Sequence, residues 1–101
     1  MTHVQRMVET NPSDHVVDTS TLVECLEACF DCAQACTACA DACLGEEDVQ
    51  MLARCIRLVL DCADVCDATG KILSPQTAFE PQMARAALDA CAQACRLCCE
   101  E

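Results

Sequence analysis

The sequence predicts an all-α protein, an antiparallel up-down helical bundle whose core is lined with cysteine. Three long segments have no proline in their interiors and are rich in Ala, Leu, Glu and Asp. Within these segments, cysteine and aliphatic residues recur at intervals of three and four, which is the period of one face of an α-helix. The connections between the segments are short, so sequential helices should pack antiparallel.

The first long helix is expected over residues 21–44. Thr21 and Glu24 have the spacing of a capping box, in which an N-cap threonine faces a glutamate three residues later. Gly45 is placed where a helix of this length would end. A glycine directly after the last periodic residue is typical of a helix C-terminus.

Two more long helices follow. The second should run from about residue 47 to Leu73, and Ser74-Pro75 should end it because proline cannot continue a helix and restricts the residue before it. The third should start near Pro81, since proline is accepted in the first turn, and should continue through the last residue. These helices form a cysteine-rich bundle over residues 20–101.

Residues 1–19 are expected to form a polar N-terminal arm with room for one helical turn from Val4 to Glu9. His3 and His15 are interpreted as solvated side chains of this arm, although imidazole also binds Cu(I). The arm has no apolar segment of the kind found in a secretory signal peptide, so we expect a cytoplasmic protein with reduced thiols. Disulfide scaffolds are also disfavoured by the odd number of cysteines, 13 in 101 residues.

The net charge of −11 argues against nucleic-acid binding, which needs a positive surface to meet the phosphates. We expect no membrane span, because charged or amide residues interrupt every apolar run. The sequence has no Ser-His-Asp set and no Gly-rich phosphate loop, and we expect a protein that is not an enzyme.

The cysteines follow a heptad pattern with cysteine where a coiled coil has leucine or isoleucine. Residues three and four apart share one face of a helix, so the thiols should form a stripe on each helix and point at a common interior. Cys99 falls one step off this pattern. The twelve cysteines on it are Cys25, Cys29, Cys32, Cys36, Cys39 and Cys43 in the first helix, Cys55, Cys62 and Cys66 in the second, and Cys91, Cys95 and Cys98 in the third.

A core with so few large side chains needs another source of stability, and bound metal would supply it. Thiolates select soft or borderline ions, chiefly Cu(I), Zn(II) and iron–sulfur clusters. Iron–sulfur proteins use a different cysteine spacing. Each zinc ion with four thiolates keeps two negative charges, so a core filled with zinc would repel itself, whereas bridged Cu(I) thiolates are almost neutral. Cu(I) is therefore favoured, and a zinc-stabilised bundle or a thiol redox protein remain as alternatives.

The segments CLEACFDCAQACTACADAC, CIRLVLDCADVC and ALDACAQACRLC resemble the four-helix-bundle copper storage proteins of the cytosolic, cysteine-rich type. The resemblance covers about residues 20–101. It implies storage of many Cu(I) ions for copper homeostasis, a homotetramer as the assembly, and a ligand role for the twelve cysteines of the pattern. The family's fourth helix has no counterpart after Cys98, so we expect either that the chain continues beyond residue 101 or that another segment or subunit covers the exposed face.

Overall fold

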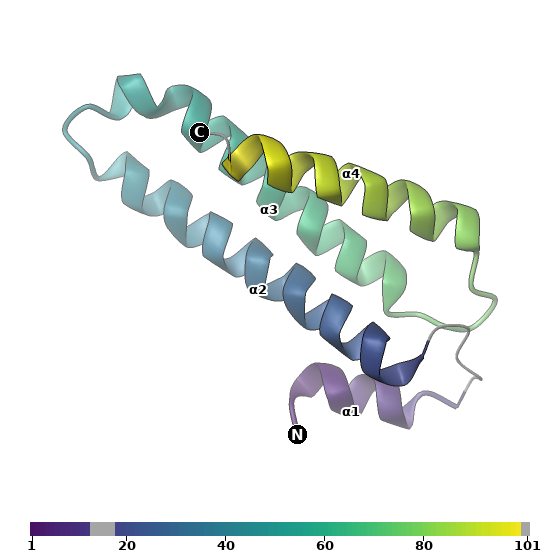
Figure 1. Cartoon of the computed structure of the whole chain (residues 1–101). Coiled ribbons are helices and arrows are strands. Elements are labelled where there is room, and N and C mark those ends of the chain that lie inside the picture. Colours follow the sequence, from purple (N-terminus) through teal and green to yellow (C-terminus); the bar gives the residue numbers. More distant parts are fainter. Residues whose placement is uncertain (13–17, 100–101) are drawn as a thin grey trace.

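The computed structural model describes residues 1–12 and 18–99, and over those residues the chain is helical with no strand (Figure 1). This confirms the all-α bundle expected from the periodicity. The elements are α1 (His3–Thr10), α2 (Thr19–Leu44), the short 3₁₀ helix η1 (Val49–Leu52), α3 (Ala53–Leu73) and α4 (Pro81–Cys99).

The three long helices are antiparallel neighbours with α3 in the middle. Figure 1 shows α3 beside both α2 and α4, while α1 packs against the part of α2 where that helix begins. Among the described residues, no Cα atom of α2 lies within 8 Å of a Cα atom of α4. The backbones of α2 and α4 therefore do not pack closely, and only side chains lie between these two helices.

The start of the first long helix differs from the expectation. α2 begins at Thr19, and its N-cap is Asp18, whose carboxylate accepts a hydrogen bond from the Thr21 amide at 3.1 Å. The predicted capping box with Thr21 as N-cap is therefore wrong. Aspartate is at least as good an N-cap as threonine, and a cap three residues earlier allows three more residues to become helical. The end at Leu44 is as predicted.

The second long helix begins later than residue 47. The α2–α3 connection includes η1, and α3 starts at Ala53 and ends at Leu73, directly before Ser74-Pro75 as expected. Asp48, the residue before η1, makes no side-chain capping hydrogen bond. The third long helix starts at Pro81 as predicted and extends through Cys99, and residues 100–101 lie outside the described residues.

Large aliphatic side chains gather at the end of the bundle near α1. Leu22, Val23, Leu26 and Leu73 form this part of the core, and Val8 of α1 is 2% exposed against it. Thr2 also donates a hydrogen bond to the Glu27 carboxylate at 2.7 Å. Burial of aliphatic groups contributes about 25 cal/mol per Å², so this end supplies much of the hydrophobic stability.

Gly70 allows α2 and α3 to approach each other. A Cβ atom added at Gly70 would lie 2.6 Å from Cζ of Phe30 on α2, which is closer than real Cβ contacts allow. The aromatic ring therefore occupies space that any other residue at position 70 would need.

None of the helices in the described part of the chain is long and apolar enough to cross a bilayer.

Candidate metal centre

Four thiols meet at the centre of the bundle. Cys32 comes from α2, Cys62 and Cys66 from α3, and Cys95 from α4, and the four sulfur atoms all lie within 4.8 Å of one another. Cys62 and Cys66 are each 1% exposed, while Cys32 and Cys95 are half-buried. The i, i+4 spacing places Cys62 and Cys66 on one face of α3 between the other two helices.

The sulfur atoms are in van der Waals and weak hydrogen-bond contact without being bonded. The Sγ atom of Cys62 lies 3.8 Å from that of Cys32, 3.9 Å from that of Cys66 and 3.6 Å from that of Cys95. Cys66 lies 3.5 Å from Cys91 and 3.8 Å from Cys95. A disulfide bond measures about 2.0 Å, so these are free thiols, as are all thirteen cysteines.

A second group overlaps the first. The sulfur atoms of Cys36, Cys62 and Cys98 also lie within 4.8 Å of one another, and Cys62 belongs to both groups. A thiolate can bridge two metal ions when it lies between two such groups. The shared sulfur therefore makes this part of the core suited to a cluster of metal ions.

Burial keeps most of the central thiols protonated. It strongly raises the pKa of Cys62 and that of Cys66, and hydrogen bonds to neighbouring thiols add to the effect. Burial likewise raises the pKa of Cys36 to about 12. A metal ion that binds these sulfur atoms must displace their protons, because the thiolate is the ligand.

Cys32 differs from its neighbours. Burial would raise its pKa, but hydrogen bonds from Cys66, Cys62 and Cys36 outweigh that effect and lower the pKa below the ordinary value. Hydrogen bonds donated to a thiolate stabilise the charged form. Cys32 is therefore the position in the central group where a thiolate forms first.

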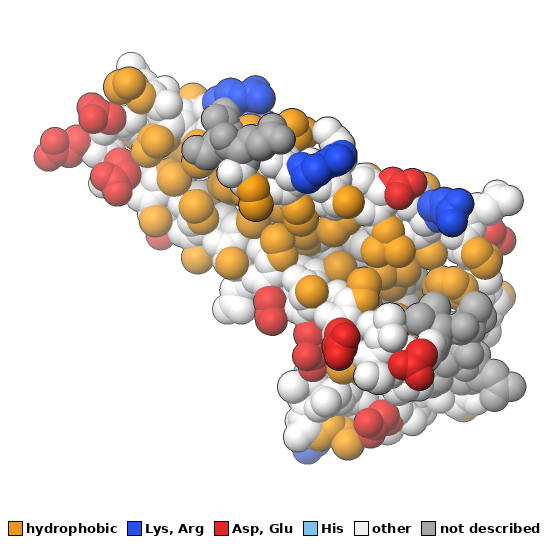
Figure 2. Space-filling model, viewed as in Figure 1, with side chains coloured by type: hydrophobic (Ala, Val, Ile, Leu, Met, Phe, Trp, Pro, Cys, Tyr) orange, Lys and Arg blue, Asp and Glu red, His pale blue; other side chains and the backbone are white. Residues whose placement is uncertain are grey.

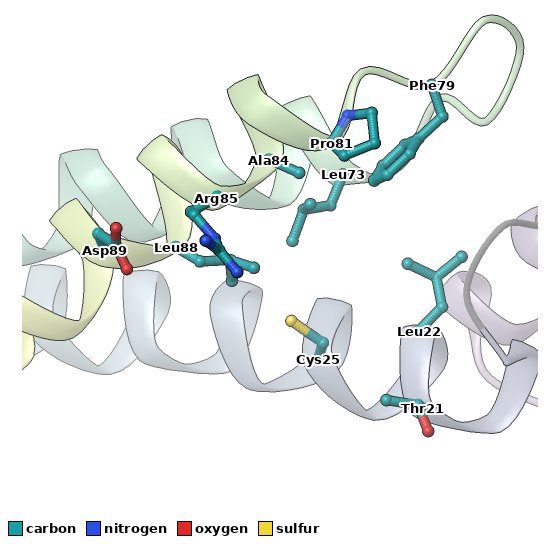
Figure 3. A pocket seen from close by; sticks show the side chains of 10 residues that line it. All are labelled: Thr21, Leu22, Cys25, Leu73, Phe79, Pro81, Ala84, Arg85, Leu88 and Asp89. Carbon is teal, nitrogen blue, oxygen red and sulfur yellow. The ribbon is translucent and has the colours of Figure 1, made fainter.

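The predicted cysteines near the start of α2 form a further group with α4. Burial, followed by the nearby thiols of Cys25 and Cys91, raises the pKa of Cys29 to about 12. Cys25 also borders a cavity of about 450 Å³ between α2 and α4. Figure 3 shows its sulfur directed toward α4, with Leu22 and Leu88 on the two sides of the opening.

The third group lies at the opposite end, in the α2–α3 hairpin. The pKa of Cys43 is raised by burial and by the thiols of Cys39 and Cys55. Cys39 is exposed, so the described helices do not enclose it. The hairpin extends past the end of the described α4, so α4 does not cover this part of the stripe (Figure 1). Cys99 is also exposed, in keeping with its place off the pattern.

Figure 2 shows which kinds of side chain lie on this face of the surface. Hydrophobic side chains, a class that includes cysteine, gather along the face between α2 and α4, with arginine and acidic side chains at its margins. Of the two histidines, His3 is exposed and His15 lies outside the described residues. Periodicity gave no sign of the cavity beside Cys25, because Phe79 of the α3–α4 loop helps to line it.

Comparisons with known proteins agree with this geometry. The sequence model of a family described as "Copper storage protein" matches residues 18–101. The structure resembles the copper storage protein Ccsp from Streptomyces lividans loaded with 10 copper equivalents, with a TM-score of 0.90 and 49% sequence identity over 94% of this chain and 73% of that chain. No curated protein matches the sequence significantly.

Two further structures of the Streptomyces lividans protein are similar. A variant with one histidine replaced by alanine has a TM-score of 0.79 and 52% identity over 81% of this chain and 68% of that chain. A form described as a cytosolic copper storage protein with five coppers has a TM-score of 0.76 and 52% identity over 78% of this chain and 66% of that chain. The family match and the identity lead to one conclusion: this chain belongs to the copper storage protein family.

Proposed function

We propose that this chain stores several copper ions as Cu(I), bound by core thiolates, and serves copper homeostasis and detoxification in the cytosol. The observation that carries the proposal is the set of thiols that three helices bring together at the centre of the bundle, in which Cys62 belongs to two ligand groups. A shared thiolate allows neighbouring ions to be linked. This is what a store of many ions needs and what a site for one ion does not.

The oxidation state follows from the ligands. The described core offers sulfur, which is a soft ligand, and soft thiolates select Cu(I) over harder ions. Cu(I) takes two or three sulfur atoms, so groups of three and four thiols can hold more than one ion each. The resulting clusters are nearly neutral, which limits the cost of charge in a buried layer.

We assign the ligand role to the twelve cysteines on the heptad pattern and leave Cys99 outside it. The thiols form three neighbouring groups along the bundle: Cys25, Cys29 and Cys91 at one end, the central group around Cys62, and Cys39, Cys43 and Cys55 at the hairpin. Exposed Cys39 gives an ion arriving from solvent an accessible first ligand.

We also propose that the chain acts as a homo-oligomer, with the tetramer as the expected assembly. The support is the apolar surface left between α2 and α4, together with exposed side chains such as Leu44 and Met83. Native mass spectrometry of the copper-free and copper-loaded protein measures the assembly directly. A monomer in both states would contradict this part of the proposal.

The test of storage is an anaerobic titration of the reduced protein with Cu(I) in the presence of a chromophoric Cu(I) chelator. Several copper ions per chain should bind before the chelator develops colour, and native mass spectrometry should show the loaded species. No uptake, or uptake of a single equivalent, would overturn the storage function. A thiol redox protein would instead form disulfides under mild oxidation without holding copper against the chelator.

Two variants test which cysteines bind copper. Replacing Cys32, Cys36 and Cys39 together with serine should lower the copper capacity while the far-ultraviolet circular dichroism stays close to that of the parent chain. Cys99→Ser is the matched control, because its thiol is exposed and off the pattern, and it should leave the capacity unchanged. Equal capacity for the triple variant and the parent would show that the assigned cysteines are not the ligands.

A further inference from the structure

The central thiols have a geometry that suits a different metal ion as well as copper. Zinc bound by four thiolates is tetrahedral with Zn–S distances of about 2.3 Å, which places the sulfur atoms about 3.8 Å apart. Four of the six sulfur–sulfur distances among Cys32, Cys62, Cys66 and Cys95 are 3.6, 3.8, 3.8 and 3.9 Å. The other two, from Cys32 to Cys66 and to Cys95, are at most 4.8 Å.

Only Cys32 has to move to complete the tetrahedron. Both of the longer distances include its sulfur, and its side chain is half-buried, so a small rotation toward Cys66 and Cys95 meets little resistance. The other three sulfur atoms already have the spacing of three corners of a zinc site. Forming the site therefore requires the movement of one side chain.

An ion at this site would link three helices. The four ligands come from α2, α3 and α4, and α2 and α4 do not approach each other closely through their backbones. The buried part of the surrounding core consists of cysteine, alanine and Val59, and Ile56 is partly buried against it. An ion at this point would join all three helices where hydrophobic packing is weakest.

We propose that the copper-free chain binds one zinc ion through Cys32, Cys62, Cys66 and Cys95, and that this zinc stabilises the bundle until Cu(I) replaces it. One ion per chain is expected in the central layer because the neighbouring group of Cys36 and Cys98 also depends on Cys62. A second zinc ion there would lack a fourth ligand of its own. Cu(I) needs fewer sulfur atoms per ion and accepts shared thiolates, so copper loading removes the zinc.

The experiment uses the whole reduced chain, freed of metal and kept anaerobic. Co(II) serves as the optical probe, since tetrahedral thiolate coordination gives strong visible d–d bands and octahedral coordination gives weak ones. One equivalent of Co(II) should bind with the tetrahedral spectrum, and one equivalent of Zn(II) should abolish it. Weak octahedral bands, or zinc uptake that continues well beyond one equivalent with no break in the titration, would overturn the proposal.

The ligands are tested with Cys95→Ser and Cys32→Ser, both at half-buried positions where serine is tolerated. Mutation of residues that hold the metal ligands in place typically lowers metal affinity about 10–100-fold. Each of these variants removes a ligand itself and should lower the zinc affinity by more than that. Zinc should raise the melting temperature of the parent chain and raise that of the variants much less. Cys99→Ser, four residues after Cys95 on the same helix, is the control and should bind zinc like the parent chain.

If Cys95→Ser and Cys32→Ser bind zinc as tightly as Cys99→Ser, the four-thiol site is refuted. Helicity measured before metal addition identifies a variant that fails to fold, and the other variant then decides the question. The outcome is separate from the copper titration. A chain that takes up many Cu(I) ions without binding zinc keeps the storage function and loses only this site.

Discussion

Raising the pH of the copper-free protein above 9 should destabilise it, because its buried thiols resist ionisation. The pKa of Cys29 and that of Cys36 are raised by burial from 9.0 to about 12 in the folded chain. In the unfolded chain these thiols ionise near the ordinary value. Their contribution to stability is therefore complete below pH 9 and is lost as the pH rises toward 12.

The size of the effect follows from the shifts. Three pKa units correspond to about 4 kcal/mol per thiol. Water reaches the face between α2 and α4, so we take about half of that value for each, or about 4 kcal/mol for the two together. This is close to the total stability of many small domains, about 5–15 kcal/mol. The raised pKa values of Cys62 and Cys66 act in the same direction.

The assay is a pH titration of the reduced protein under anaerobic conditions, followed by far-ultraviolet circular dichroism and by thiolate absorbance. The sequence has no tyrosine and no tryptophan, so the absorbance change reports the thiols. Helicity should fall between pH 9 and 12 together with the rise in thiolate absorbance. The copper-loaded protein should show no such transition, because its ligands have already lost their protons.

Lys71 is the one lysine of the sequence, and it pairs with Asp67 at 3.1 Å. Lys71→Arg keeps the positive charge at all these pH values and should unfold like the parent chain. The reasoning would be refuted if the thiols ionised near pH 9 while the helices stayed intact. That result would mean that water reaches the central sulfur atoms freely.

Three other perturbations test separate parts of the structure. Cys62→Ser should lower the copper capacity by roughly two ions per chain, one from each thiol group that it completes, while the capacity of Cys99→Ser stays unchanged in the chelator titration. Equal capacity for the two variants would mean that Cys62 is not shared. Gly70→Ala should lower stability by about 1–3 kcal/mol in thermal unfolding, because the new methyl group would overlap the ring of Phe30, and Phe30→Leu should recover part of the loss. A more stable Gly70→Ala would show that helix propensity outweighs the contact. Asp18→Ala should lower stability by about 1 kcal/mol through loss of the N-cap, whereas Asp18→Asn should cost much less, and similar melting temperatures for both would contradict the capping role.

Local sequence signals defined the helices well where they were strong. Ser74-Pro75 and Pro81 gave the correct end of α3 and the correct start of α4, because proline restricts the backbone regardless of what packs around it. The predicted start of α2 was wrong, since the N-cap is Asp18 and not Thr21. Aspartate and threonine are both preferred N-caps, so the local sequence alone does not choose between them.

The candidate site was likewise predicted in part from the sequence. The heptad pattern placed the central cysteines on the inner faces of their helices, and the structure brings Cys32, Cys62, Cys66 and Cys95 together. The pattern did not distinguish Cys39 from Cys36, although one is exposed and the other buried. Both occupy equivalent positions on one helix, so the difference depends on how far the neighbouring helices extend.

The sequence by itself determined the helical class, the stripe of thiols and the choice of soft metal ions, because periodicity and ligand chemistry are properties of the chain alone. The tertiary structure decided which thiols meet, that Cys62 is shared between two groups, and that Cys32 differs in pKa from its neighbours. These features depend on distances between helices. They arise only when α2, α3 and α4 pack, because sulfur atoms some thirty residues apart in the sequence then come within 4 Å of one another.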